Sequence, residues 1–169
     1  AKVFGNKPEH FLIDPQGLIT EQKANDVLRF LEIHSSDSRF PIYPVVLGRD
    51  QKIPASFDIE NVHREWFGKH PAILLIYYFD DPESLKILVN REVQSEIPST
   101  VLEKITNITI REAKAADNGP DQLEKIVIEL SIQAFWLEKL MDRQPLTFLP
   151  ETVTSPIDVS ATVQDLQDE

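Results

Sequence analysis

The feature that most constrains the fold is an uninterrupted apolar run, AILLIYYF, over residues 72–79. A helix needs about 20 apolar residues to cross a bilayer, so this run is too short to span a membrane. Its length and its aromatic and branched side chains are typical of a strand buried on both faces. Such burial requires covering elements on each side, so the run predicts a central strand in a sheet flanked by helices.

The N-terminal part of the chain predicts a short strand followed by a helix. Phe11–Ile13 is apolar and is closed by the turn-forming sequence Asp-Pro-Gln-Gly, so we expect a strand there. Thr20 is suited to cap a helix that ends before Ser35, because apolar residues then recur at helical spacing (Ala24, Val27, Leu28, Leu31).

The middle of the chain predicts a second strand, a short helix and a hairpin. Residues 42–47 form a strand at an outer position, since Pro44 lacks the N–H that a central strand would donate. Asp58 is expected to cap a helix that ends at Gly68. After the central strand, residues 80–84 form a polar connection, and residues 85–90 return as an antiparallel strand.

Two helices are expected in the C-terminal half. Pro98-Ser99-Thr100 opens the first, with Thr100 and Glu103 spaced as a capping box. Residues 114–120 interrupt the pattern, and a long amphipathic helix runs from Asp121 to Met141. Residues 144–169 contain prolines, acids and hydroxyl residues without Lys or Arg, so we expect an extended tail or linker there.

The elements in the order βαβαββαα predict an α/β (α+β) three-layer sandwich, in which helices flank a small mixed sheet. We expect a lead-in over residues 1–10, a single domain over residues 11–143 and a tail over residues 144–169. A chain of 169 residues is long enough to bury one core without disulfides.

Composition excludes several classes of function. The net charge of −11 repels phosphate backbones and anionic lipid, so we expect no nucleic-acid partner. The absence of cysteine excludes thiolate metal sites and cysteine nucleophiles. The five glycines form no phosphate-binding loop, and no serine-hydrolase or zinc-protease motif occurs.

Four aspartates follow predicted strands and are candidate ligands for a cation. Asp14, Asp50, Asp80 and Asp81 stand where strands of an open α/β sheet end, which is where such sheets bind ligands. Carboxylates are the ligands of Ca²⁺ or Mg²⁺, so Asp14, Asp80 and Asp81 form a possible metal site. The alternative is that these residues are turn formers whose carboxylates bind nearby backbone N–H groups.

The pair Asp80 and Asp81 also matches the acid and nucleophile of phosphoryl transfer, with Arg49 or Arg91 as the supporting cation. No motif places either arginine beside the pair. Surface turns are therefore the simpler interpretation of both aspartates.

Aromatic residues suggest two further places of interest. His63, Trp66, Phe67 and His70 either line an aromatic pocket, or Trp66 packs on the sheet while both histidines face solvent. On the last helix, Trp136 would mark an interface if it lies opposite Leu137 and is exposed.

Two short motifs resemble the TPM domain family. Ile13-Asp14-Pro15-Gln16-Gly17-Leu18-Ile19-Thr20 is similar to the step with which members open, and Glu65-Trp66-Phe67-Gly68 before Ile73–Ile76 is similar to the family's Trp-Gly step. The resemblance covers roughly residues 11 to 140. Asn90–Gln94 departs from the family, whose members have a glycine-rich strand exit and a Thr-Asp step there.

The resemblance implies an exported domain, periplasmic or otherwise extracytoplasmic, often tethered by a membrane segment outside it. It also implies a role either as an interaction or assembly module that binds calcium, or as an acid phosphatase. The chain begins at Ala1 and its only methionine is Met141, so we expect a trimmed chain or one whose leader was removed, and export is permitted. We therefore expect a non-catalytic module that binds a protein partner, with the acid phosphatase as the alternative.

Overall fold

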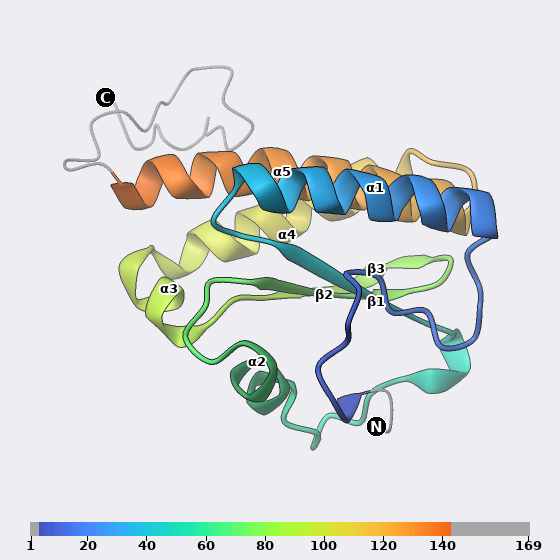
Figure 1. Ribbon diagram of the computed structural model, residues 1–169, viewed down its shortest axis with the longest axis horizontal. Helices are drawn as coiled ribbons and strands as arrows, with labels where there is room; N and C mark the ends of the chain where they lie inside the picture. Colours follow the sequence, from blue (N-terminus) through green and yellow to red (C-terminus); the bar gives the residue numbers. More distant parts are fainter. Residues whose placement is uncertain (1–3, 143–169) are drawn as a thin grey trace.

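The structure, a computed structural model, describes residues 4–142. Over these residues the chain is a mixed α+β protein with five α-helices and one three-stranded sheet in the order β1-β2-β3. Helices lie on both faces of the sheet (Figure 1). The predicted α/β (α+β) class with a small mixed sheet is confirmed, but the elements follow in the order α1-β1-α2-β2-β3-α3-α4-α5 and not βαβαββαα.

The sheet is mixed, with its most apolar strand in the middle. β1 (Ile42–Leu47) pairs in parallel with β2 (Ile73–Tyr78), and β2 pairs antiparallel with β3 (Asp81–Leu88). Every residue of β2 is buried, as the continuous apolar run predicts. β1 lies at an edge of this sheet, where Pro44 does not interrupt a central ladder.

The first predicted strand, Phe11–Ile13, is wrong in its extent. Only Ile13 forms a bridge, parallel to Val45 of β1, in which the Ile13 N–H donates to Pro44 at 3.0 Å and the Val46 N–H donates to Ile13 at 2.8 Å. The chain leaves the sheet directly afterwards, because the Asp14 carboxylate binds the N–H groups of the following turn.

The hairpin is also tighter than the polar sequence after β2 suggests. Residues 81–84 belong to β3 and not to the connection, so the predicted strand 85–90 begins four residues too late and ends two too late. Asp80 makes the short turn possible by adopting a φ of 61°, and Tyr78 pairs directly with Asp81. Leu85, Ile87 and Val89 are buried as the predicted alternation requires.

The first two helices agree with the predicted caps. α1 (Glu21–Asp37) begins after Thr20, whose hydroxyl accepts the N–H of Lys23, and α2 (Ile59–Phe67) begins after Asp58, whose carboxylate accepts the N–H of Asn61. α1 continues past the expected end at Ser35. Ser35 and its neighbour Ser36 are both helical, and each donates its hydroxyl to a carbonyl of the preceding turn.

The C-terminal half contains one helix that the periodicity does not predict. α3 (Arg91–Glu96) precedes α4 (Ser99–Lys114) and α5 (Gly119–Asp142). The capping box between Thr100 and Glu103 is not formed, because Pro98 occupies the N-cap position of α4 and Thr100 lies inside the helix. α5 starts before Asp121, since the Asn118 side chain caps it by accepting the Asp121 N–H at 2.9 Å.

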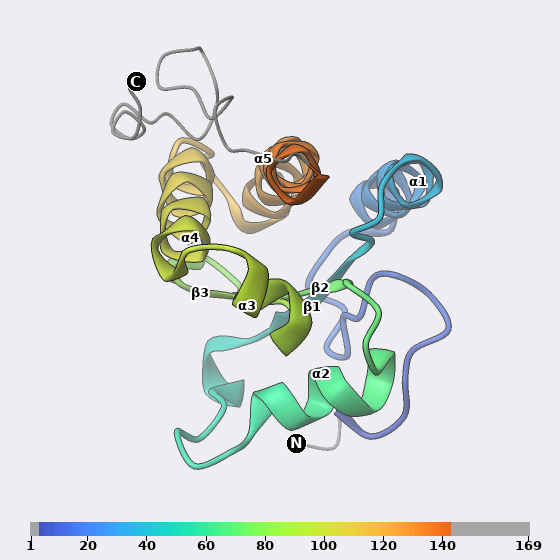
Figure 2. The same ribbon diagram turned by 90° about the vertical axis from the view of Figure 1, so that its left-hand side faces the viewer.

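Two apolar clusters occupy the two faces of the sheet. Figure 2 shows α1, α4 and α5 on one side of the sheet and α2 on the other. α1, α4 and α5 cover one face and contribute the larger cluster, which includes Leu31, Ile105 and Leu130. α2 covers the other face through Trp66 and Phe67. Side chains alternate between the faces along β2, which is why the strand reads as one continuous apolar run.

The N-terminal lead-in is part of this second cluster. Phe4 is buried, with its ring centroid 5.6 Å from that of Phe57 and 6.0 Å from that of Trp66. The predicted tail over residues 144–169 lies outside the described residues. Among residues 4–142, no helix is long and apolar enough to cross a membrane.

Candidate functional site

The four aspartates at predicted strand ends do follow segments that end at one edge of the sheet. Ile13, β1 and β2 are mutually parallel, so the loops after Ile13, Leu47 and Tyr78 leave the same edge. Side chains of two of these loops meet over Gly48, where an added Cβ would lie 2.4 Å from Gln16 Oε1 and 2.7 Å from Asp50 Oδ1. We refer to residues 14–17, 48–52 and 79–80 as the strand-end loops; Asp81 follows the last of them as the first residue of β3.

Asp14 organises its own loop. Its Oδ1 accepts the Leu18 N–H at 2.9 Å and its Oδ2 accepts the Ile19 N–H at 2.8 Å. Both carboxylate oxygens thus have backbone donors, and Gly17 in the same turn has a φ of 64°, a conformation that favours glycine. This is the arrangement of an aspartate turn.

We expect Asp14→Ala to lower the free energy of unfolding by about 1–3 kcal/mol, because it leaves two partly buried N–H groups without an acceptor. Asp14→Asn retains one carbonyl acceptor and should cost less. Urea denaturation in calcium-free buffer checks both values. If Asp14→Ala changes stability only when Ca²⁺ is present, Asp14 is a metal ligand and not a turn former.

Asp80 and Asp81 lie beside two cations. The backbone carbonyl of Asp80 accepts a hydrogen bond from Arg49 Nη2 at 2.6 Å, and the Asp81 carboxylate lies 3.2 Å from Lys52 Nζ. Asp81 also accepts the Ser84 hydroxyl at 2.8 Å, and this hydrogen bond, together with Lys52, lowers the pKa of its carboxyl. Arg49 therefore lies beside the Asp80–Asp81 turn, where it contacts the backbone of Asp80.

Arg91 is not part of these loops. It begins α3 and its nearest ion-pair partner is Glu60, at 3.7 Å. The second cation beside the aspartates is instead Lys52, which the sequence does not single out. The Lys52 ammonium also lies 4.6 Å from the centre of the Tyr78 ring. Across residues 4–142, no group of three or more histidine or acidic side chains is arranged to hold a metal ion.

Around the end of α2, the interpretation in which Trp66 packs on the sheet and both histidines face solvent is wrong for one histidine. His63 is buried, and its Nε2–H donates to the Ala72 carbonyl at 2.7 Å. Burial lowers the pKa of this imidazole, which favours its neutral form. Trp66 packs edge-on against Phe67 beside the sheet, and His70 is exposed as expected. His63 is thus a satisfied core histidine that links α2 to the start of β2.

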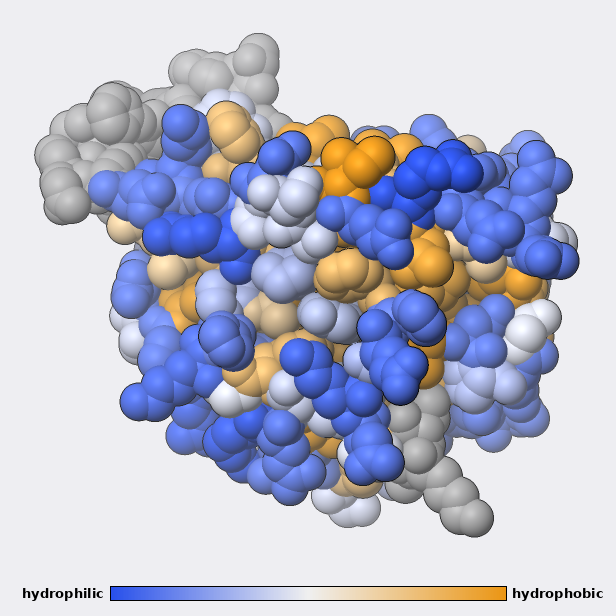
Figure 3. Space-filling model, in the orientation of Figure 1, coloured by the Kyte–Doolittle hydropathy of each residue, from blue (hydrophilic) through white to orange (hydrophobic). Residues whose placement is uncertain are grey.

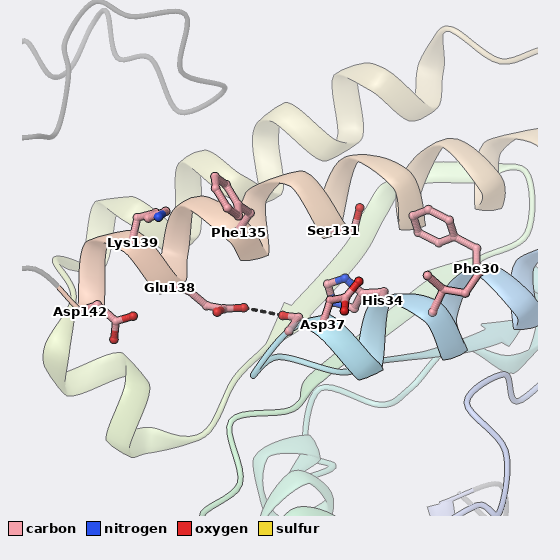
Figure 4. A pocket seen from close by; sticks show the side chains of 10 residues that line it. Phe30, His34, Asp37, Ser131, Phe135, Glu138, Lys139 and Asp142 are labelled. Atoms are coloured by element: carbon pink, nitrogen blue, oxygen red, sulfur yellow. Dashed lines mark hydrogen bonds between the residues drawn. The ribbon is translucent and has the colours of Figure 1, made fainter.

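A partly apolar groove lies between α1 and α5, and we call it the α1–α5 groove (Figure 4). It has a volume of about 390 Å³. Its apolar lining consists of Phe30, Ile33 and Phe135, and its charged lining of Asp37, Glu138, Lys139 and Asp142.

Polar contacts hold α1 and α5 side by side near both ends of this helix pair. At the N-terminal ends, Lys23 Nζ lies 3.0 Å from Asp121 and 2.7 Å from Glu124, and these contacts raise the pKa of its ammonium. At the C-terminal ends, Glu138 accepts the Ser38 hydroxyl at 2.6 Å. Because both ends are fixed, the groove is part of the folded structure without a ligand.

An exposed apolar stripe continues from the groove along α5. Residues 4–142 expose four large hydrophobic side chains, and all four belong to α1 or α5: Ile33 at 59%, Ile128 at 42%, Ile132 at 40% and Phe135 at 53%. The three on α5 recur at positions i, i+4 and i+7, so they share one side of the helix. In Figure 3, hydrophobic residues gather along the upper edge, where α1 and α5 lie. We call these four residues the α1–α5 apolar face.

The sequence pointed to Trp136 on this helix, and the exposed ring is its neighbour Phe135. Trp136 is half-buried, while Phe135 beside it is exposed, with the two rings edge-to-face at 5.6 Å. The signal in the sequence was the spacing of Ile128, Ile132 and Phe135, which form a second apolar stripe outside the core stripe of the same helix.

Comparison with models of known families and with curated proteins finds no match to this chain.

Proposed function

We propose that this chain is a non-catalytic interaction module that binds a protein partner on the α1–α5 apolar face. The observation that carries the proposal is that all four large hydrophobic side chains exposed by residues 4–142 lie on these two adjacent helices. Scattered exposed hydrophobics are normal on a soluble protein, but their concentration on one face is typical of an interaction surface.

The preformed groove supports this proposal. Lys23 at one end and Ser38 at the other fix α5 against α1, so a partner would not need to order the two helices when it binds. An apolar side chain of the partner would fit between Ile33 and Phe135, while the acidic groups at the rim favour a segment that carries Lys or Arg.

We further propose that the module acts outside the cytoplasm, as an exported domain tethered to a membrane by regions outside this sequence. The support is the resemblance of the 13–20 and 65–68 motifs to the TPM domain family.

A double substitution tests the interaction. We expect the immobilised chain to retain a specific protein from an extract of its native cells, and Ile132→Ser with Phe135→Ser to reduce that retention at least tenfold, since buried interface residues often contribute about 2 kcal/mol each. Lys86→Ser with Glu103→Ser is a matched control, because both residues are exposed on other elements. Equal retention by both double variants contradicts the proposal.

Acid phosphatase activity is the second candidate, and its support is Arg49 and Lys52 beside Asp80 and Asp81. A chromogenic phosphate ester, assayed at acidic and neutral pH with and without divalent ions, separates the two functions. The interaction module predicts no turnover above buffer. Turnover that is lost in Asp80→Asn with Asp81→Asn would establish the enzyme instead.

Cation binding by Asp14, Asp80 and Asp81 has a separate test. If these acids bind Ca²⁺ or Mg²⁺, the melting temperature rises by several degrees, because an ion at 100 times its Kd adds about 2.7 kcal/mol to stability. Sodium chloride at the same ionic strength is the control for screening. Equal melting temperatures in all three salts would show that the aspartates act in turns alone.

A further inference from the structure

We infer that a pocket between the end of α2 and the start of α3 binds a small oxyanion that carries a hydroxyl group. The pocket, which we call the α2–α3 pocket, has a volume of about 330 Å³ and includes Arg64, Lys69, Asn90 and Arg91 in its lining. α2 and α3 lie at one end of the molecule and the strand-end loops at the other (Figure 1), so this site is separate from Asp80 and Asp81. Its lining also shares no residue with the α1–α5 apolar face of the proposed function.

Cations in this pocket are poorly paired, although the chain as a whole is acidic. Within residues 4–142 the Lys69 ammonium forms no hydrogen bond or close ion pair, and Arg91 has one ion-pair contact, to Glu60 at 3.7 Å. Hydrogen bonds from its own backbone and from Asn90 lower the pKa of Glu92, and the charges of Lys69 and Arg91 also help to lower it. Arg64 donates a hydrogen bond to the uncharged side-chain oxygen of Asn61, Oδ1, at 2.7 Å. Five charged residues line the pocket, three basic (Arg64, Lys69, Arg91) and two acidic (Glu60, Glu92), so the lining carries 3 − 2 = +1 in a chain of net charge −11. A small anion would satisfy these side chains.

Asn90 provides a hydrogen-bond acceptor that has no donor. It is only 6% exposed, and its Oδ1 is buried without a hydrogen-bond partner. The orientation of its amide is fixed, because Nδ2 donates both to the Lys69 carbonyl at 3.0 Å and to Glu92 Oε1 at 2.9 Å, and two acceptors require the nitrogen on that side. The remaining oxygen needs a donor, and leaving a buried acceptor unpaired is unfavourable.

One kind of ligand would both pair with the cations and donate a hydrogen bond to Asn90. An oxyanion pairs with Lys69 and Arg91, and a hydroxyl on the same small molecule donates to Asn90. Hydrogenphosphate has this combination, because it keeps a P–OH group near neutral pH. A short hydroxycarboxylate has it too, whereas sulfate and a simple carboxylate at neutral pH offer an anion without a donor.

Matched probes test this inference on the complete chain. Amide chemical shifts are followed by NMR at pH 7 and constant ionic strength, during titration with phosphate, sulfate, lactate and propionate. We expect saturable chemical-shift changes at Lys69, Asn90 and Arg91. In one of two pairs, the probe with a hydroxyl group should bind with at least tenfold higher affinity: phosphate compared with sulfate, or lactate compared with propionate. The pair that shows the difference identifies the anion class.

Exposed variants locate the site without disturbing the core. Lys69→Gln and Arg91→Gln should each weaken binding several-fold, whereas Lys86→Gln, an exposed lysine on β3, should leave it unchanged. Absence of saturable shifts with all four probes overturns the inference, as does equal affinity within both pairs or equal weakening by Lys86→Gln.

Discussion

Leu31→Ala is expected to lower the free energy of unfolding by about 2–5 kcal/mol, whereas Ile33→Ala on the same helix should change it by less than about 0.5 kcal/mol. Leu31 is 0% exposed and lies in the larger core cluster, so its removal leaves a cavity. Ile33 is 59% exposed at the α1–α5 groove, and alanine has the higher helix propensity.

Urea denaturation of both variants measures this difference. The pair is informative because the two residues are close in sequence and similar in size, and differ in the side of α1 that they occupy. If Ile33→Ala costs as much as Leu31→Ala, Ile33 is packed in the core and the apolar face is smaller than described.

Tyr77→Phe is expected to lower the free energy of unfolding by about 1–3 kcal/mol, since it leaves buried polar groups unpaired. The Tyr77 hydroxyl lies 2.5 Å from Gln122 Oε1, to which it donates, and it accepts the Asp80 N–H at 3.1 Å. One hydroxyl thus joins β2, the hairpin turn and α5. Tyr77 and Gln122 are both buried, so water would not replace the lost hydrogen bonds.

The same side chain should make stability fall at alkaline pH. Burial raises the pKa of Tyr77 from 10.0 to about 12. Between these values the unfolded chain loses the proton first, so the stability from the neutral hydroxyl is complete below pH 10 and is lost by about pH 12. A shift of two pKa units corresponds to about 3 kcal/mol.

Denaturation of the wild type and of Tyr77→Phe between pH 8 and about 12 isolates this effect, because the variant lacks the titrating group. Burial also raises the pKa of Tyr43, and the subtraction removes that contribution. Parallel pH profiles for the two proteins would show that Tyr77 is accessible to solvent in the folded state.

The sequence predicts most elements here because their signals are local. The spacing of Val27 and Leu31 and the continuous run of β2 each depend on neighbours along the chain, and both elements form where expected. The start of β3 was missed for a physical reason. Asp81-Pro82 is typical of a turn, but β3 is an edge strand and Asp80 alone supplies the left-handed conformation that the turn needs.

Features that depend on the packing of distant segments could not be predicted from the sequence. α3 has six residues, too few for an apolar period to show. The α1–α5 groove exists because two helices far apart in the sequence lie parallel, joined by Lys23 at one end and Glu138 at the other. The same holds for the α2–α3 pocket, where Asn90 meets the carbonyl of Lys69.

Site-specific photocross-linking shows whether α1 and α5 present a binding face. A photoreactive phenylalanine analogue at Ile132 should give a covalent adduct with a protein partner in native extract, and Phe135→Ser in the same chain should abolish it. The analogue at Glu103, exposed on α4, is the control and should give no adduct. Adducts of equal yield from positions 132 and 103, or adducts that survive Phe135→Ser, would contradict the claim.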